Sequence, residues 1–232
     1  MKIEIWSDYA CPYCYIGERQ LEKALESFSG KEDIEISYKC FELDPYASYE
    51  TVSTTKERVA KKYGYTSEQA QQMIDNVTRY AKSVGLDYNY GTTRYTNTFD
   101  AHRIAKYAET KGKGVEISGK LFHAYFTENK QMSDHKVLTD IAIEVGLDKL
   151  EVEDVLKNNK FAQEVRNDEY EASRLRVHAV PFFLINGKYS LSGAQPPEAF
   201  ESIIEKVLQE EKIEADNLGG MICSIDGCRP LK

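Results

Sequence analysis

Hydrophobic and polar positions alternate in two short segments near the N-terminus, with a helical pattern between them. Residues 2–6 (K-I-E-I-W) and 34–41 (I-E-I-S-Y-K-C-F) follow the two-residue alternation that predicts strands. From Tyr15 onward the apolar residues recur at helical spacing, and Gly30 ends that pattern. The beginning of the chain therefore predicts a strand–helix–strand unit.

From Thr54 to about Arg176 the spacing of apolar residues is helical nearly throughout, and glycines separate the segments. The expected helices run roughly over Thr55–Tyr63, Ser67–Val84, Thr98–Lys111, Val115–Glu128, His135–Val145, Val152–Asn158 and Ala162–Leu175. A helical block of this length, between two regions of alternating pattern, indicates an insertion.

The alternating pattern returns after the helical block. Pro181–Ile185 predicts a strand, Asn186-Gly187 a tight hairpin turn, and Lys188–Ser192 the partner strand. Pro197 then opens a last amphipathic helix, because proline fits the first helical turn.

These segments together predict an α/β protein with a thioredoxin fold and a large all-helical insertion. We assign residues 1–42 and 177–212 to the thioredoxin-fold domain and residues 43–176 to the helical insertion domain. Residues 213–232 form a C-terminal tail with little periodicity, which carries a second cysteine pair.

Composition and charge narrow the classes of partner. No apolar stretch in the 232 residues approaches a membrane span, and the N-terminus has acidic residues where a signal peptide has an apolar run. We therefore expect a cytoplasmic protein that does not bind a membrane. The formal net charge of −8 is spread along the chain and disfavours nucleic-acid binding, because an acidic surface repels phosphates.

Among the five cysteines, Cys11 and Cys14 have the spacing and context of a redox pair. They form a C-x-x-C directly after a predicted strand and at the start of a helix. Unpaired N–H groups and the helix dipole stabilise a thiolate at that position, and Pro12 fits the first turn. We therefore expect Cys11 to attack a disulfide and the more buried Cys14 to resolve the mixed disulfide.

A proline before the third predicted strand supports this interpretation. Thioredoxin folds have a cis-proline there, in a loop that faces the cysteines and pairs with an extended substrate. We therefore expect Val180, Pro181 and Tyr13, which lies between the cysteines, to contact substrate. The alternatives for the cysteine pair are half of a zinc site and an incidental pair.

Three segments resemble the FrnE-like branch of the DsbA family. They are W-S-D-Y-A-C-P-Y-C-Y-I-G (residues 6–17), N-T-F-D-A-H-R (97–103) and V-P-F-F-L-I-N-G-K-Y-S-L-S-G-A-Q-P-P (180–197). The resemblance covers nearly the whole chain, through about Leu208. It implies a thiol–disulfide oxidoreductase or disulfide isomerase without a bound organic cofactor. Protein or small-molecule substrates carrying thiols or disulfides are the implied partners.

At the positions that match the family motif, the resemblance implies that Cys11 is the nucleophile, Cys14 the resolving cysteine and Pro181 the cis-proline. The chain departs from the family pattern at two places. Tyr13 stands where the family often has tryptophan, and Ala179 where it often has glycine. The residues between the cysteines tune the redox potential. Tyr13 therefore makes the family's redox potential harder to assign to this chain.

Two other functional classes stay open. Glutathione-dependent isomerases of the chromene-carboxylate isomerase and kappa transferase type have a similar insert but tend to have serine in place of the redox pair. The intact Cys11 and Cys14 argue against that class, although glutathione stays possible as a co-substrate. The third class is a non-enzymatic zinc-binding or chaperone-like module.

The remaining candidates are Cys223, Cys228, Cys40 and His102. The four-residue spacer between Cys223 and Cys228 allows a local disulfide, so an auxiliary redox pair is our hypothesis. The alternatives for these two cysteines are half of a metal site and an unpaired tail. We assign no metal to the protein. Cys40, in the second strand, is expected to be a buried inert thiol. His102 is expected to line the cleft and bind substrate, or to be an ordinary helix histidine.

Overall fold

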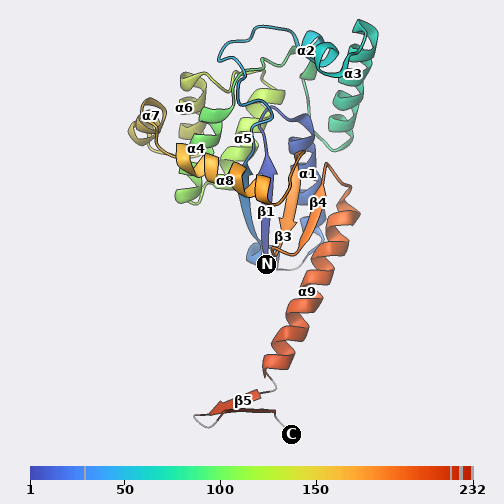
Figure 1. Ribbon diagram of the computed structural model, residues 1–232, viewed down its shortest axis with the longest axis vertical. Coiled ribbons are helices and arrows are strands. Elements are labelled where there is room, and N and C mark those ends of the chain that lie inside the picture. The colour runs from blue at the N-terminus through green and yellow to red at the C-terminus, as the bar shows by residue number, and fades with distance from the viewer. Residues whose placement is uncertain (29, 220, 225–226, 231–232) are drawn as a thin grey trace.

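The computed structural model describes the backbone of residues 1–28, 30–219, 221–224 and 227–230, and side chains as far as residue 213 except at positions 29 and 32. A mixed sheet lies at its centre, with strand order β2-β1-β3-β4 (Figure 1). The strands are β1 (Lys2–Ser7), β2 (Glu35–Cys40), β3 (Phe182–Ile185) and β4 (Tyr189–Ser192). Because β1 pairs parallel with β2 and antiparallel with β3, the two ends of the chain share one sheet, and the predicted thioredoxin fold is confirmed.

A three-residue turn, Asn186 to Lys188, joins β3 to β4. Asn186 and Gly187 have positive φ angles of 50° and 65°, and Ile185 lies opposite Tyr189. These are the backbone conformations of the turn that matches the twist of a hairpin, and asparagine and glycine adopt them most easily. The predicted hairpin is therefore confirmed.

Two helices, α1 (Pro12–Glu26) and α9 (Pro197–Gly219), cover one face of the sheet. Their apolar side chains pack on alternate residues of the strands, and the rings of Phe183 and Phe200 meet edge to face at 4.8 Å. On the other face, the Trp6 indole donates a hydrogen bond of 3.0 Å to the carbonyl of Asp168 in α8 (Ala162–Arg174). Both faces of the sheet are thus buried.

The helical insertion lies at the end of the sheet where α1 begins. In Figure 1, α2 and α3 stand on one side of α1, and α4 to α7 on the other. The elements are α2 (Thr55–Tyr63), α3 (Ser67–Ser83), α4 (Phe99–Thr110), α5 (Gly114–Phe126), α6 (His135–Glu144) and α7 (Lys149–Lys157), with short 3₁₀ turns η1 (Lys31–Asp33) and η2 (Tyr90–Thr92). None of the helices within the described ranges combines the length and the apolar content that a membrane span requires.

Side-chain caps explain why some helices begin where they do. Thr54 and Thr66 form capping boxes at the starts of α2 and α3. The structure begins α7 earlier than the expected Val152, because the Asp148 carboxylate accepts a hydrogen bond of 3.0 Å from the Glu151 backbone N–H.

The last helix is longer than its apolar pattern predicts. It continues past Lys212 to Gly219, through a segment in which Glu214, Ala215 and Leu218 have good helix propensity. A hairpin of β5 (Met221–Ser224) and β6 (Gly227–Pro230) follows, in which Cys223 lies opposite Cys228. Residues directly opposite in an antiparallel pair have Cα separations of about 4.5–5.5 Å, a range that suits a disulfide. The side chains of both cysteines lie outside the described residues, so their redox role stays a prediction.

Candidate active site

The turn after β1 places Cys11 at the start of α1. The Asp8 carboxylate accepts a hydrogen bond from the Ala10 N–H, and the Asp8 carbonyl accepts one of 2.9 Å from the Cys11 N–H. Cys11 is the N-cap residue, with extended backbone angles, and Pro12 occupies the first turn. The Cys11 sulfur therefore lies beside the unpaired N–H groups of a helix N-terminus, as the sequence predicts.

The two thiols of the pair have different surroundings. Cys14 lies one turn into α1, is almost fully buried, and both cysteines are free thiols. Burial raises the pKa of the Cys14 thiol well above its ordinary value, and its hydrogen bond with the Cys11 sulfur adds to the rise. Cys14 therefore stays protonated, which suits a resolving thiol and leaves Cys11 as the attacking one.

The Val180–Pro181 peptide bond is cis, as predicted, and its loop lies beside the cysteines. The Cys11 thiol donates a hydrogen bond of 3.5 Å to the Val180 carbonyl oxygen. The Pro181 carbonyl accepts a hydrogen bond of 2.8 Å from the Gly193 N–H, which ties the loop to the end of β4. The fold thus brings together Cys11, Val180 and Pro181 from distant parts of the chain.

Gly17 lets α1 approach this loop closely. A Cβ atom at position 17 would lie 3.0 Å from Pro181 Cγ and 3.1 Å from Phe183 Cζ, which is tighter than normal contact. The glycine therefore sets the distance between the cysteine helix and the Pro181 loop.

We expect Gly17→Ala to cost about 1–3 kcal/mol of unfolding free energy and to lower the rate at which Cys11 is alkylated or oxidised, because the added methyl group displaces Pro181. Denaturant unfolding and thiol-reaction kinetics would measure both effects. Gly119→Ala in α5 is the matched control, since the nearest atom to its new Cβ lies 3.8 Å away. Equal changes in unfolding free energy and in Cys11 reaction rate for the two variants would contradict the role of Gly17.

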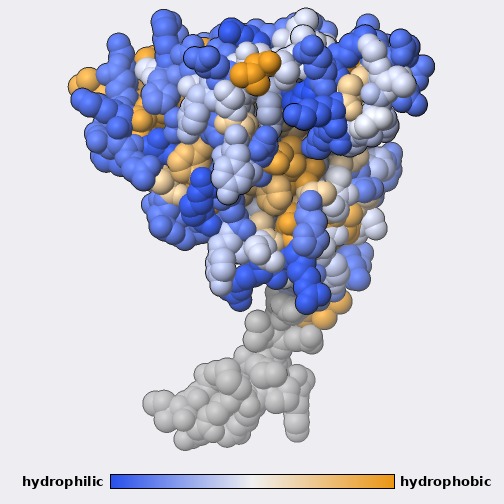
Figure 2. Space-filling model, turned by 45° about the horizontal axis from the view of Figure 1, so that its top comes forward, coloured by the Kyte–Doolittle hydropathy of each residue, from blue (hydrophilic) through white to orange (hydrophobic). Residues whose placement is uncertain are grey.

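Tyrosines rim the entrance to the cysteines. Tyr13 is 37% exposed, and Tyr63 and Tyr65 stack on each other at 5.5 Å with their outer faces in solvent. Burial raises the pKa of Tyr13, and the nearby Tyr63 and Cys11 add to the rise. The phenol rings of Tyr13 and Tyr63 are thus close to the Cys11 sulfur. Figure 2 shows apolar residues gathered near the centre of the face that it displays, between the α2–α3 side and the α6–α7 side.

The insertion supplies the wall behind the cysteines. The Tyr88 hydroxyl donates a hydrogen bond of 2.8 Å to the Pro12 carbonyl, inside the C-P-Y-C segment. The ring of Tyr15 stacks on Phe122 of α5 with centroids 5.3 Å apart. The first turn of α1 is therefore held by side chains of the inserted helices.

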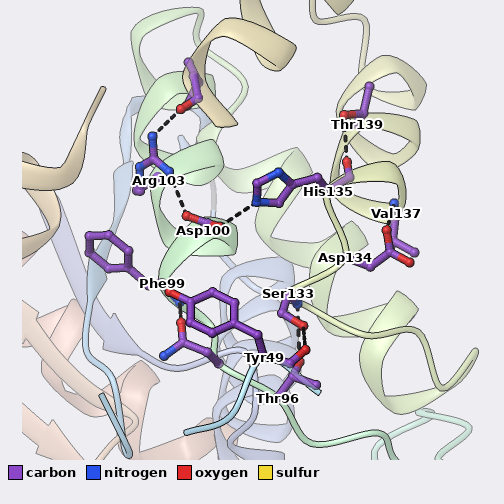
Figure 3. A network of polar contacts seen from close by, with 12 residues as sticks. Tyr49, Thr96, Phe99, Asp100, Arg103, Ser133, Asp134, His135, Val137 and Thr139 are labelled. Atoms are coloured by element: carbon purple, nitrogen blue, oxygen red, sulfur yellow. Dashed lines mark hydrogen bonds and ion pairs between the residues drawn. The ribbon is translucent and has the colours of Figure 1, made fainter. Parts of the chain in front are cut away.

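The N-T-F-D-A-H-R segment begins α4 and joins the inserted helices (Figure 3). Asp100 pairs with Arg103 at 2.7 Å and with His135 of α6 at 2.7 Å. The Arg103 guanidinium also donates to the carbonyls of Val155, Asn158 and Lys160 at the end of α7. These carbonyls have no partner within α7, so Arg103 satisfies them. Most of this segment therefore has a structural role.

His102 does not lie on the substrate-facing surface where we expected it. It is 2% exposed, and its ring packs on Tyr9 with centroids 4.8 Å apart. Its Nε2 atom has no hydrogen-bond partner and lies 3.8 Å from Asp8 Oδ1. The buried side of α4 faces the turn between β1 and α1, so His102 reaches Asp8 and not the cleft.

Two buried carboxyl groups near the pair were not identified from the sequence. Asp8 lies three residues before Cys11, and Glu18 lies one turn after Cys14; both are buried. Their closeness to the cysteine pair in the sequence could have drawn attention to them. Aspartate and glutamate are rarely buried, so two of them beside a pair of buried thiols are unusual.

Cys40 has the surroundings of an inert thiol. It is 2% exposed, its backbone N–H donates to Asp168, and burial raises the pKa of its thiol well above the ordinary value. Among the side chains that the structure describes, no group of three or more His, Cys, Asp or Glu is arranged to hold a metal ion. A zinc site that includes Cys223 and Cys228 falls outside those side chains and stays untested.

Comparisons with known proteins agree with this geometry. The model of the DSBA-like thioredoxin domain family matches residues 2–205. The crystal structure of a probable DsbA oxidoreductase from Streptomyces coelicolor is 34% identical, with a TM-score of 0.83 over 99% of this chain and 98% of that one. The uncharacterized protein YwbO of Bacillus subtilis (strain 168) is 27% identical over 205 residues, which is 87% of this chain and 94% of YwbO.

A more distant likeness concerns the fold alone. The cytosolic disulfide reductase DsbM from Pseudomonas aeruginosa, in a structure with GSH, has a TM-score of 0.62 at 14% identity, over 90% of this chain and all of that one. With the family model spanning most of the chain, and the cis-proline loop beside a C-x-x-C helix, this chain belongs to the DsbA family of thioredoxin-fold proteins, which are generally thiol–disulfide oxidoreductases.

Proposed function

We propose that this protein catalyses thiol–disulfide exchange with the Cys11/Cys14 pair on thiol- or disulfide-containing protein or small-molecule substrates. The observation that supports the proposal most is the difference between the two thiols. Cys11 lies at a helix N-terminus beside the Val180 carbonyl, while burial keeps Cys14 protonated. An attacking thiolate next to a protonated resolving thiol is what exchange chemistry requires.

The reaction follows from this arrangement. The Cys11 thiolate attacks one sulfur of a substrate disulfide, which forms a mixed disulfide and releases the first substrate thiolate. Cys14 then loses its proton and attacks the Cys11 sulfur, which breaks the mixed disulfide and releases the second substrate thiolate. The substrate gains two electrons, and Cys11 and Cys14 are left as a disulfide. The reverse sequence oxidises a substrate dithiol.

We further propose glutathione as a co-substrate that returns the pair to the reduced state. The likeness to DsbM, whose structure contains GSH, supports this assignment. Two glutathione molecules would supply the two electrons and leave as glutathione disulfide.

Turnover of a model disulfide with glutathione as the reductant tests the proposed function. Wild type is expected to accelerate the reaction and, after oxidation, to contain a Cys11–Cys14 disulfide by peptide mass spectrometry. Cys40→Ala is the matched control and is expected to retain the rate, because the Cys40 thiol is buried near Asp168 and Lys106. A wild-type rate equal to the uncatalysed rate, or an oxidised protein without the Cys11–Cys14 disulfide, would refute the proposal.

A further inference from the structure

The helix α2 concentrates positive charge in an acidic protein. It has four basic residues and one acidic residue, while the whole chain has a formal net charge of −8. Three of the basic residues, Arg58, Lys61 and Lys62, are spaced three and four positions apart, so they share one side of the helix. We call these three residues the α2 basic face.

The cations of the α2 basic face form no ion pair with a carboxylate among the side chains that the structure describes. Lysines elsewhere do, such as Lys111 at the end of α4, which pairs with Glu151 at 2.8 Å. The single carboxylate of α2, Glu57, accepts hydrogen bonds from the N–H and the hydroxyl of Thr54 as part of the helix cap. The positive charge of this face is therefore available to a ligand.

Tyrosine rings hold two of these cations in position. The Arg58 guanidinium lies 4.1 Å from the centre of the Tyr95 ring, and Lys62 Nζ lies 5.7 Å from the centre of the Tyr63 ring. A tyrosine ring attracts a cation through its quadrupole but has no net charge that would neutralise it. Arg58 is also half-buried, and its Nη1 atom has no hydrogen-bond partner. Both cations are thus ordered and keep their full charge.

The start of α2 is tied to the cysteine turn through residues 88–93. The hydroxyl groups of Thr55 and Thr93 form a hydrogen bond of 2.8 Å. Five residues earlier, the Tyr88 hydroxyl donates a hydrogen bond of 2.8 Å to the Pro12 carbonyl between the two cysteines. One short segment of chain therefore contacts both α2 and the C-P-Y-C turn.

The end of α2 lies at the entrance to the cysteines. Tyr63, its last residue, is one of the tyrosines that rim this entrance, and Lys62 directly precedes it. In Figure 1, α2 stands beside the start of α1, the helix that Cys11 caps. A substrate whose sulfur reaches Cys11 therefore lies next to the α2 basic face.

The chemistry of the site indicates what kind of ligand this face binds. A ligand that reacts at Cys11 contains a thiol or a disulfide, which nucleic acids and lipid head groups do not supply. Guanidinium and ammonium groups pair with carboxylates, and one carboxylate cannot reach all three cations. Lys61 and Lys62 are exposed on the outside of the helix, where a small molecule has few contacts. A polypeptide can cover them while its cysteine reaches Cys11.

We propose that the α2 basic face binds an acidic polypeptide segment that flanks the reacting cysteine of a protein substrate. The inference rests on the proposed exchange function and adds the class of substrate. Opposite charges on the two partners raise the rate at which the substrate sulfur meets Cys11, by about tenfold or more at low ionic strength. The Cys11 thiolate then attacks that sulfur, the mixed disulfide forms, and the leaving thiolate departs with the electron pair.

Three peptides of equal length test the inference on the reduced full-length protein. Each has one cysteine, followed by a run of glutamates, of glutamines or of lysines, and the cysteine carries a thiopyridyl group through a disulfide. Attack by Cys11 on the cysteine sulfur releases thiopyridone, which is followed by its absorbance. Each second-order rate constant is divided by that of mercaptoethanol with the same peptide, which corrects for intrinsic reactivity. The corrected rate of wild type is expected to be about tenfold higher for the acidic than for the neutral peptide, and lowest for the lysine peptide.

Variants of α2 should change the ratio of the acidic to the neutral rate. Lys62→Glu is expected to lower this ratio by about threefold or more, whereas a merely structural effect slows both peptides alike and leaves it unchanged. Arg58→Gln should lower the ratio as well, and Arg58→Lys, which keeps the charge, should restore it. Lys157→Glu is the matched control, since Lys157 is an exposed lysine in the last turn of α7, a helix of nine residues like α2.

The salt dependence of wild type gives a test that needs no variant, should an Arg58 variant not fold. Raising the ionic strength from about 0.01 M to about 1 M shortens the Debye length from about 30 Å to about 3 Å, so the preference for the acidic peptide should disappear. A preference that survives this change would contradict an electrostatic origin.

Three other results would also decide the matter. Equal corrected rates for the acidic and the neutral peptide in wild type would overturn the inference, and so would equal ratios in Lys62→Glu and Lys157→Glu. A charge preference confined to small disulfides, with dithiodipropionate faster than bis(hydroxyethyl) disulfide and no preference among the peptides, would exclude a polypeptide as the ligand. If wild type reacts with none of the peptides faster than mercaptoethanol does, the proposed function itself fails.

Discussion

Cys14→Ser is expected to accumulate as a mixed disulfide on Cys11, and Cys11→Ser is expected to lose exchange activity by about three orders of magnitude or more. The two variants should differ because the two sulfurs act in different steps of the exchange. Cys11 lies at the N-terminus of α1 beside the Val180 carbonyl and makes the first attack. Without Cys14, the substrate on Cys11 can leave only when an external thiol reaches it.

Incubation with glutathione disulfide, followed by intact-protein mass spectrometry, checks this expectation. The Cys14→Ser protein should carry one glutathione, which a reductant removes, and the Cys11→Ser protein should carry almost none. Cys40→Ala should behave as wild type. Rapid adduct formation on Cys14 in the Cys11→Ser protein would reverse the roles that we assign.

Glu18→Gln is expected to make the protein more stable than wild type above about pH 8, by several kcal/mol. Burial raises the pKa of Glu18 from 4.5 to about 8, although the hydrogen bond of 2.5 Å from the Tyr38 hydroxyl acts in the opposite direction. The second carboxyl oxygen, Oε2, has no partner. A glutamine keeps an oxygen that accepts from Tyr38 and has no charge to bury.

The sign follows from proton binding. The folded protein holds the Glu18 proton up to about pH 8, whereas the unfolded chain releases it near 4.5. The stability from this group is therefore fully present below 4.5 and is lost as the pH rises to about 8, a total on the order of 5 kcal/mol. Wild type should lose this stability on alkalinisation, and the Gln variant should not.

Urea unfolding at intervals between about pH 4 and pH 9 measures the difference between the two proteins. Glu22→Gln, one turn along α1 with a half-exposed side chain, is the matched control and should keep the wild-type pH dependence. The expectation fails if Glu18→Gln and wild type lose stability in parallel across this range.

The order of strands and helices, and the cysteine pair, could be predicted from the sequence because they depend on local patterns. Alternation in residues 2–6 and helical spacing in residues 55–63 reflect which side of one element faces the core, and that periodicity is fixed by backbone geometry. The C-x-x-C and the valine–proline before β3 were recognisable in the same way. Both depend on a helix start or a strand start that lies next to them in the chain.

Tertiary structure alone decided what the buried polar groups contact. Arg103 and His102 are neighbours on α4, yet Arg103 caps α7 and His102 faces Asp8. Glu18 resembles any helix glutamate in the sequence, and its high pKa comes from the sheet and α5 that cover it. Local pattern shows which residues turn inward. The protonation and the partner of an inward polar group depend on desolvation and on contacts between segments far apart in the chain, and those exist only once the fold has brought them together.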